Sequence, residues 1–138
     1  MIHRDIKPEN IVLEGGAAGG RVRLVDFGGV QGALATADAA ALGSTVIGTA
    51  GYMPPEQFGG AATPASDLYA LGAVLLFLLS GRPPSSFPNE RLRVAWERDV
   101  DVSGPLRTLL RGLLEPIAED RITAAQVCTL SRGRAACF

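Results

Sequence analysis

The segment formed by residues 3–10 brings together side chains that could carry out acid–base and metal chemistry. Asp5 offers a carboxylate that can accept a proton, and Lys7 adds a positive charge two residues later. Asn10 ends the segment with an amide oxygen, and a second carboxylate, Asp26, follows two short apolar runs. Carboxylate and carbonyl oxygens are the ligands that Mg²⁺ prefers. These residue types suit a reaction that needs a proton acceptor, a fixed positive charge and a divalent metal ion.

Three sequence motifs follow one another along the first 56 residues. Residues 3–10 read H-R-D-I-K-P-E-N, which fits the catalytic-loop signature H-R-D-L-x-x-x-N with Ile in place of Leu. Residues 26–28 read D-F-G, and residues 48–56 read G-T-A-G-Y-M-P-P-E. The last motif is similar to the end of a kinase activation loop, with Pro55 at the central Pro of A-P-E. The chain therefore resembles the large, mostly helical lobe of a Ser/Thr protein kinase.

This resemblance implies phosphoryl transfer, in which the protein positions the reacting groups and stabilises charge. Asp5 would accept the proton of the substrate hydroxyl, and Lys7 would steady the transferring phosphate and favour Ser/Thr over Tyr substrates. Asn10 and Asp26 would hold Mg²⁺, and Thr49 would bond to the catalytic Asp and Lys. The residues expected around ATP are Lys7, Asn10, Asp26 and Val12, the last as packing under the adenine ring. The expected activity is that of a kinase that transfers the γ-phosphate of ATP to a Ser/Thr hydroxyl of a protein substrate.

Residues 29–46 are rich in Ala, Gly and Thr and by the same resemblance belong to the activation loop. Thr36, Ser44 and Thr45 are the candidate phosphorylation sites for an upstream kinase. Arg4 would pair with such a phosphate through a bidentate, charge-assisted contact that orders the loop. The alternative is that these hydroxyls are ordinary solvated loop side chains.

Further residues are expected to support the site. By resemblance, Glu56 forms a buried ion pair with Arg121, and Asp67 anchors the backbone of the catalytic loop. Asp67 could equally cap a helix, and the two roles are compatible. His3 is expected to be a packed structural histidine, because Asp5 holds the role of base. The structural set also includes Phe27 and Gly28 of the D-F-G motif.

A β-hairpin is expected directly after the catalytic loop. Residues 11–13 and 22–25 are β-prone, and the glycine-rich residues 15–20 connect them. Arg and apolar residues alternate over residues 21–24, as they do in a half-buried strand. The glycine-rich connector is interpreted as a flexible hairpin tip, because it lacks the G-x-x-x-x-G-K pattern of a phosphate-binding loop.

Helical spacing of apolar residues predicts a central helix over residues 66–80. It is apolar nearly all round, which indicates full burial, with Ser66 or Asp67 as its cap and Gly81 at its end. Further helices are expected at residues 88–98 on the surface, at residues 105–114 with Ser103 as cap, and from residue 120 onward.

The predicted fold class is mainly α, a protein-kinase-like C-lobe with one short β-hairpin and with the N-lobe absent. Residues 1–138 are expected to form one partial protein kinase domain. Its parts are a catalytic loop at residues 3–13, D-F-G at 26–28, an activation segment at 26–56, a central buried helix at 66–80 and closing helices at 88–131.

Composition argues against several classes of protein. A hydrophobic fraction of 47% argues against disorder, and a net charge of −1 provides no basic surface for nucleic acid or anionic lipid. The longest apolar stretch, residues 68–79, is too short to span a bilayer. Cys128 and Cys137 fit neither a zinc site nor a disulfide framework. No signal peptide is recognisable, so an intracellular, cytoplasmic location is expected, with a targeting segment ahead of Met1 left open.

The 138 residues contain no G-x-G-x-x-G-x-V loop and no V-A-I-K strand. We therefore expect a fragment or an incomplete gene model of a kinase, with little or no activity alone. The alternative is a non-catalytic half-kinase that acts as a binding, scaffold or decoy module. Retention of Asp5, Lys7, Asn10 and Asp26 favours the enzyme, because a docking module has no use for metal ligands. A P-loop enzyme is excluded by the lack of a Walker A sequence.

Overall fold

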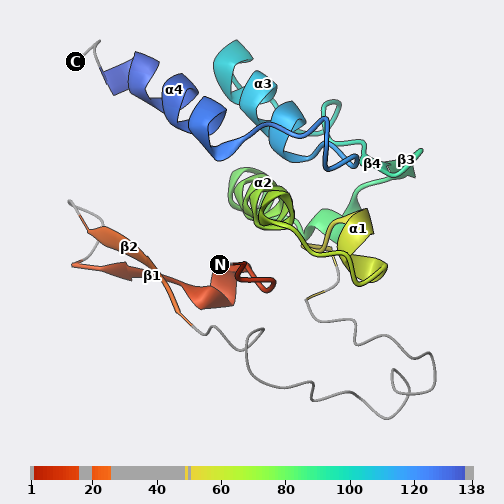
Figure 1. Cartoon of the computed structure of the whole chain (residues 1–138). Coiled ribbons are helices and arrows are strands. Elements are labelled where there is room, and N and C mark those ends of the chain that lie inside the picture. Colours follow the sequence, from red (N-terminus) through yellow and green to blue (C-terminus); the bar gives the residue numbers. More distant parts are fainter. Residues whose placement is uncertain (1, 16–19, 26–48, 50, 136–138) are drawn as a thin grey trace.

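The computed structural model describes residues 2–15, 20–25, 49 and 51–135, with the backbone alone for residues 132–135. Within this part of the chain the fold is mainly helical, with two small two-stranded antiparallel sheets (Figure 1). The elements, in order, are η1 (Pro8–Asn10), β1 (Ile11–Glu14), β2 (Arg21–Leu24), α1 (Pro55–Phe58), α2 (Pro64–Ser80), η4 (Pro84–Ser86), β3 (Asn89–Glu90), β4 (Arg93–Val94), α3 (Gly104–Leu113) and α4 (Ala124–Ala135).

The predicted hairpin after the catalytic loop is confirmed. Strands β1 and β2 pair antiparallel, with Ile11 opposite Leu24 and Glu14 opposite Arg21. The prediction that β2 is half-buried is wrong, because all four of its residues are exposed. Alternation in sequence shows that a strand could bury one face, but not that another element covers that face.

Helix α2 lies at the centre of the fold, between the N-terminal segment and helix α3 (Figure 1). It begins at Pro64, a position where the missing proline N–H costs no helical hydrogen bond. Thr63 is the N-cap, and its N–H donates to Ser66 Oγ at 3.0 Å. The prediction of Ser66 or Asp67 as the cap is therefore wrong, since both lie in the first turn. The predicted end at Gly81 is confirmed, with Gly81 left-handed at a φ of 67°.

The burial of α2 differs from the prediction. One face packs into a core that contains Leu76, Trp96 and Leu110, with Trp96 only 1% exposed. Full burial is nevertheless wrong for the C-terminal turn, where Leu78 and Leu79 are exposed. Apolar composition reflects how much surface a helix could bury, while the partners in the fold determine how much it does bury.

The expected surface helix at residues 88–98 is wrong, and a second hairpin occupies this segment. Strands β3 and β4 pair through a two-residue turn at Arg91 and Leu92, both with positive φ. The chain then turns so that Trp96 enters the core. Burial of one large aromatic side chain outweighs the weak helical preference of this segment.

The last two predicted helices are present, but their boundaries differ from the prediction. Helix α3 follows Ser103, which is its N-cap residue but makes no side-chain cap hydrogen bond. Helix α4 begins at Ala124 instead of residue 120. Thr123 and Gln126 cap it reciprocally, since the Thr123 N–H donates to Gln126 Oε1 at 2.8 Å and the Gln126 N–H donates to Thr123 Oγ1 at 3.3 Å. Among the helices described, none combines the length and apolarity needed to cross a membrane.

Candidate active site

The backbone of the segment at residues 3–10 is held by the central helix. In the first turn of α2, Asp67 Oδ2 accepts the His3 N–H at 2.8 Å, and Asp67 Oδ1 accepts the Arg4 N–H at 2.9 Å. The contact that the family resemblance implied for Asp67 is therefore present in the structure. His3 is buried, and Ile6 packs against α2 at Ala70.

A second contact on this backbone comes from a residue that the sequence analysis did not single out. Gln57 Nε2 donates to the Arg4 carbonyl oxygen at 2.7 Å. Gln57 lies on the short helix α1 and is only 5% exposed. The available signal was its position directly after Glu56, in a segment already expected to support the site.

Four side chains converge at the catalytic-loop position. The Thr49 hydroxyl donates to Asp5 Oδ1 at 2.9 Å, and Lys7 Nζ lies 2.9 Å from Asp5 Oδ2. Lys7 Nζ also donates to Thr49 Oγ1 at 3.1 Å. Each of the side chains of Asp5, Lys7 and Thr49 therefore contacts the other two. Asn10 is buried, and its Nδ2 donates to the Asp5 carbonyl at 2.8 Å and to Asp5 Oδ2 at 3.2 Å. The structure thus places four residues expected in the catalytic set in one cluster, which we call the Asp5 cluster: Asp5, Lys7, Asn10 and Thr49.

The electrostatics of the Asp5 cluster favour a carboxylate anion. Partial burial alone would raise the pKa of Asp5, but hydrogen bonds from Lys7, Thr49 and Asn10 outweigh burial and hold that pKa below its ordinary value. Asp5 is therefore ionised at neutral pH. It can accept a hydrogen bond from a hydroxyl placed beside it, and the cluster fixes the direction from which that hydroxyl must approach.

The hairpin joins the Asp5 cluster to the segment that contains D-F-G. The Val25 N–H donates to the Asn10 carbonyl at 2.9 Å, next to the pair that Ile11 of β1 forms with Leu24 of β2. The residue before Asp26 is therefore tied to Asn10. Asp26, Phe27 and Gly28, and the candidate phosphorylation sites Thr36, Ser44 and Thr45, lie outside the described residues. Val12, expected under an adenine ring, lies on β1 and is 41% exposed.

A largely buried ion pair connects α1 to the segment before α4. Arg121 Nη1 lies 2.7 Å from Glu56 Oε1, and Arg121 Nη2 donates to Glu56 Oε2 at 3.1 Å. The remaining three N–H groups of the guanidinium donate to main-chain carbonyls, those of Glu115, Ala65 and Pro116. All five donors of Arg121 are satisfied.

The charge on Glu56 is stabilised by this arrangement. Partial burial would raise the pKa of Glu56, but the hydrogen bonds from Arg121 and Ser66 and the helix backbone lower it below its ordinary value. Arg121 also lies over the Tyr69 ring, 5.1 Å from the centroid. The ion pair expected between Glu56 and Arg121 is present and is bidentate.

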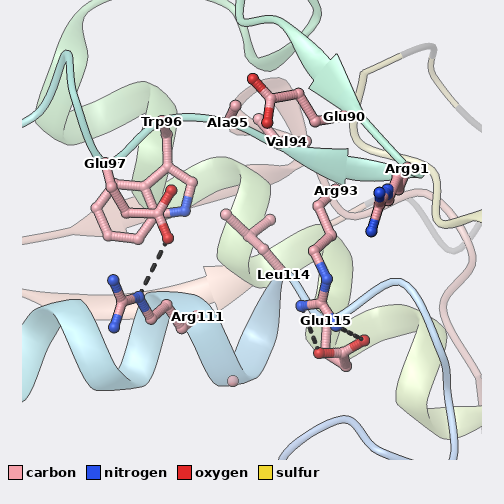
Figure 2. Close-up of a pocket in the computed structure, with 11 residues that line it drawn as sticks. Glu90, Arg91, Arg93, Val94, Ala95, Trp96, Glu97, Arg111, Leu114 and Glu115 are labelled. Atoms are coloured by element: carbon pink, nitrogen blue, oxygen red, sulfur yellow. Dashed lines mark hydrogen bonds and ion pairs between the residues drawn. The ribbon is translucent and has the colours of Figure 1, made fainter.

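A separate cavity of about 770 Å³ lies between the β3–β4 hairpin and α3 (Figure 2). Its charged side chains are largely paired, since Arg93 forms a bidentate pair with Glu115 and Arg111 lies 3.1 Å from Glu97. The cavity shares no residue with the Asp5 cluster. We therefore place the candidate active site at the Asp5 cluster.

Comparison with known proteins identifies the family to which the chain is similar. The model of the protein kinase domain matches residues 1–131. Serine/threonine-protein kinase B of Synechocystis is 34% identical over 134 residues, which cover 91% of this chain and 23% of that protein. Serine/threonine-protein kinase PknA of Nostoc is 36% identical over 132 residues, with the same two coverages. PknL of Mycobacterium tuberculosis is 41% identical over 104 residues, which cover 74% of this chain and 25% of that protein. The chain spans about a quarter of the length of these relatives.

Proposed function

Because the chain belongs to the protein kinase family, we propose that its residues are the C-terminal lobe of a Ser/Thr kinase domain and that the Asp5 cluster serves phosphoryl transfer from ATP to a protein hydroxyl. The observation that carries this proposal is the joint placement of Asp5, Lys7, Asn10 and Thr49. Four side chains from two segments that are distant in the sequence meet within hydrogen-bonding distance. A purely structural loop would not require this combination of anion, cation and amide.

In this proposal, Asp5 orients the substrate hydroxyl and receives its proton. The hydrogen bond from Thr49 and the ammonium group of Lys7 fix the carboxylate, so an incoming hydroxyl meets an acceptor whose direction is already set. Lys7 has three ammonium protons, and two of them face Asp5 and Thr49. The third can contact the phosphoryl group, where it would stabilise the charge in the transition state.

The described donor set fits part of a magnesium site. The side-chain amide of Asn10 is oriented by its two contacts with Asp5, and the hairpin ties Asn10 to the residue before Asp26. When bound, Mg²⁺ would neutralise charge on the phosphates. No group of three or more acidic, His or Cys ligands occurs among the described residues. Two protein oxygen ligands, with phosphate and water completing the shell, is the usual arrangement for this ion.

We expect the 138-residue chain alone to have little or no kinase activity, because it carries neither the phosphate-covering glycine motif nor the V-A-I-K lysine. Turnover of Mg–ATP that disappears in Asp26→Asn would contradict this expectation.

The binding function can be tested on the chain itself with a paramagnetic metal. We would titrate the ¹⁵N-labelled chain with Mn²⁺ and ATP and follow line broadening by NMR. The account predicts selective broadening of the Asn10 side-chain amide and the Val25 amide, and its loss in Asp26→Asn. Asp99→Asn is the control, because Asp99 is exposed and lies outside the site. Equal broadening at Asn10 and at the buried Trp96 indole would refute a metal–nucleotide site at the Asp5 cluster.

A further inference from the structure

The backbone at Arg4 has an unusual conformation. Its φ is 69°, in the left-handed region that is unfavourable for a residue with a side chain. Such conformations persist where the surrounding structure holds them, and they are common at functional sites. Arg4 directly precedes Asp5, so its conformation determines the direction in which Asp5 leaves the backbone.

Two side chains hold Arg4, and they act on different peptide units. The Arg4 N–H, which donates to Asp67 Oδ1, belongs to the peptide unit before the Arg4 Cα. The Arg4 carbonyl, which accepts from Gln57 Nε2, belongs to the peptide unit after it. Because each unit is planar, the first contact restrains φ of Arg4 and the second restrains ψ. Asp67 alone would leave ψ unrestrained by these contacts.

The Gln57 side chain is buried on helix α1, and contacts of its neighbour Glu56 hold this helix in place. Gln57 is 5% exposed, and its neighbour Glu56 is fixed by the bidentate pair with Arg121. Burying an amide group is unfavourable unless the group is hydrogen-bonded. The 2.7 Å hydrogen bond from Gln57 Nε2 to the Arg4 carbonyl oxygen therefore stabilises the buried position of this side chain.

We propose that Gln57 is a positioning residue that holds Arg4 in its left-handed conformation and thereby aims the Asp5 carboxylate. The role of this orientation of Asp5 in catalysis rests on the proposed function. The effect of Gln57 on the backbone conformation of Arg4 does not. Helix α1 then links two parts of the molecule through neighbouring residues. Glu56 secures the helix to Arg121, and Gln57 transmits that fixed position to the loop.

The test uses backbone chemical shifts of the labelled chain. We would compare Gln57→Met, which keeps the volume but removes the donor, with Gln57→Asn, which keeps an amide but is one methylene too short. The ¹³Cα and ¹³Cβ shifts of Arg4 report its backbone conformation. Exchange of the Asn10 side-chain amide protons reports the contact with Asp5.

We expect both Gln57 variants to shift the Arg4 carbons away from left-handed values. We also expect exchange of the Asn10 amide protons to become about tenfold faster. The indole signal of Trp96 should stay unchanged, because Trp96 and the loop residue Ile6 belong to different clusters of buried residues. Leu110→Ala is the control for general loosening, since it removes a buried side chain of that core. It should disturb Trp96 and leave the Arg4 carbons in place.

Unchanged Arg4 shifts in a folded Gln57 variant would overturn the proposal. Loss of the Trp96 signal in both Gln57 variants would also overturn it, because Gln57 would then have a general packing role. Neither readout needs nucleotide or turnover. A failure of the kinase proposal would therefore leave these shifts as expected, and a failure of the Gln57 proposal would leave Mn²⁺–ATP binding intact.

Discussion

Replacing Glu56 by Gln should strongly destabilise the fold. The substitution keeps the size of the side chain but leaves the Arg121 guanidinium without its counter-charge. Arg121 is only 4% exposed, so water cannot replace the lost carboxylate. Breaking a buried ion pair from one side costs about 3–5 kcal/mol. The side chain of Glu56 keeps 16% exposure, so we expect a loss near the lower limit, about 3 kcal/mol.

The assay is urea unfolding followed by the fluorescence of Trp96, the single tryptophan of the chain. Glu14→Gln is the matched control, because it makes the same chemical change in the exposed pair with Arg23. Exposed pairs contribute at most about 1 kcal/mol, so this variant should unfold close to wild type. Equal destabilisation by the two variants would refute the reasoning that burial gives the Glu56 pair its importance.

The same pair predicts a pH dependence with a definite sign. The pKa of Glu56 is lower in the folded chain than its ordinary value, so the unfolded chain binds the proton more readily. The stability from this group is complete above the unfolded-state pKa and is lost as the pH falls through the folded-state pKa. The difference in unfolding free energy between wild type and Glu56→Gln should therefore shrink in acid. A difference that grows in acid would contradict this linkage.

Three further predictions concern the supporting structure. Asp67→Ala should expose two backbone amides of the catalytic loop, and their hydrogen exchange should accelerate while that of α3 stays slow. Gly72→Ala should lower the free energy of unfolding in urea by about 1–3 kcal/mol, because the new Cβ would lie 2.7 Å from Leu113 Cβ. Gly104→Ala is the control and should be nearly neutral, because a Cβ there meets no atom within 4 Å. Thr123→Ala should cost about 1 kcal/mol, because it removes the cap of α4, and no change in unfolding would show that the cap contributes nothing.

Much of the site could be predicted from the sequence, because its contacts are made by residues of a recognisable motif. The hairpin at β1 and β2, the contact of Asp67 with the loop and the pair of Glu56 with Arg121 are all present. The family pattern specifies the partners of the charged residues Asp67 and Glu56. The glycine-rich connector marks the turn of the hairpin. Gln57 was missed because an amide side chain carries no charge pattern, and its role depends on the conformation of a residue 53 positions away.

The errors in the fold have a common physical cause. Periodicity shows which surfaces can be buried, but the neighbours of an element decide which surfaces are buried. Leu78 is 66% exposed at the end of α2 although its helix is apolar nearly all round. Trp96, in a segment predicted to be a surface helix, is a central core residue. In both cases tertiary packing overrides the local pattern.

The central claim is that the Asp5 cluster belongs to a catalytic lobe, and a chimera tests it most directly. The segment that precedes the matched region of Nostoc PknA would be joined ahead of residue 2, and transfer of radiolabelled phosphate from ATP to protein would be measured. The account predicts transfer that is abolished in Asp5→Asn and retained in Asp99→Asn. A folded chimera that transfers no phosphate, or one whose activity survives Asp5→Asn, would contradict it.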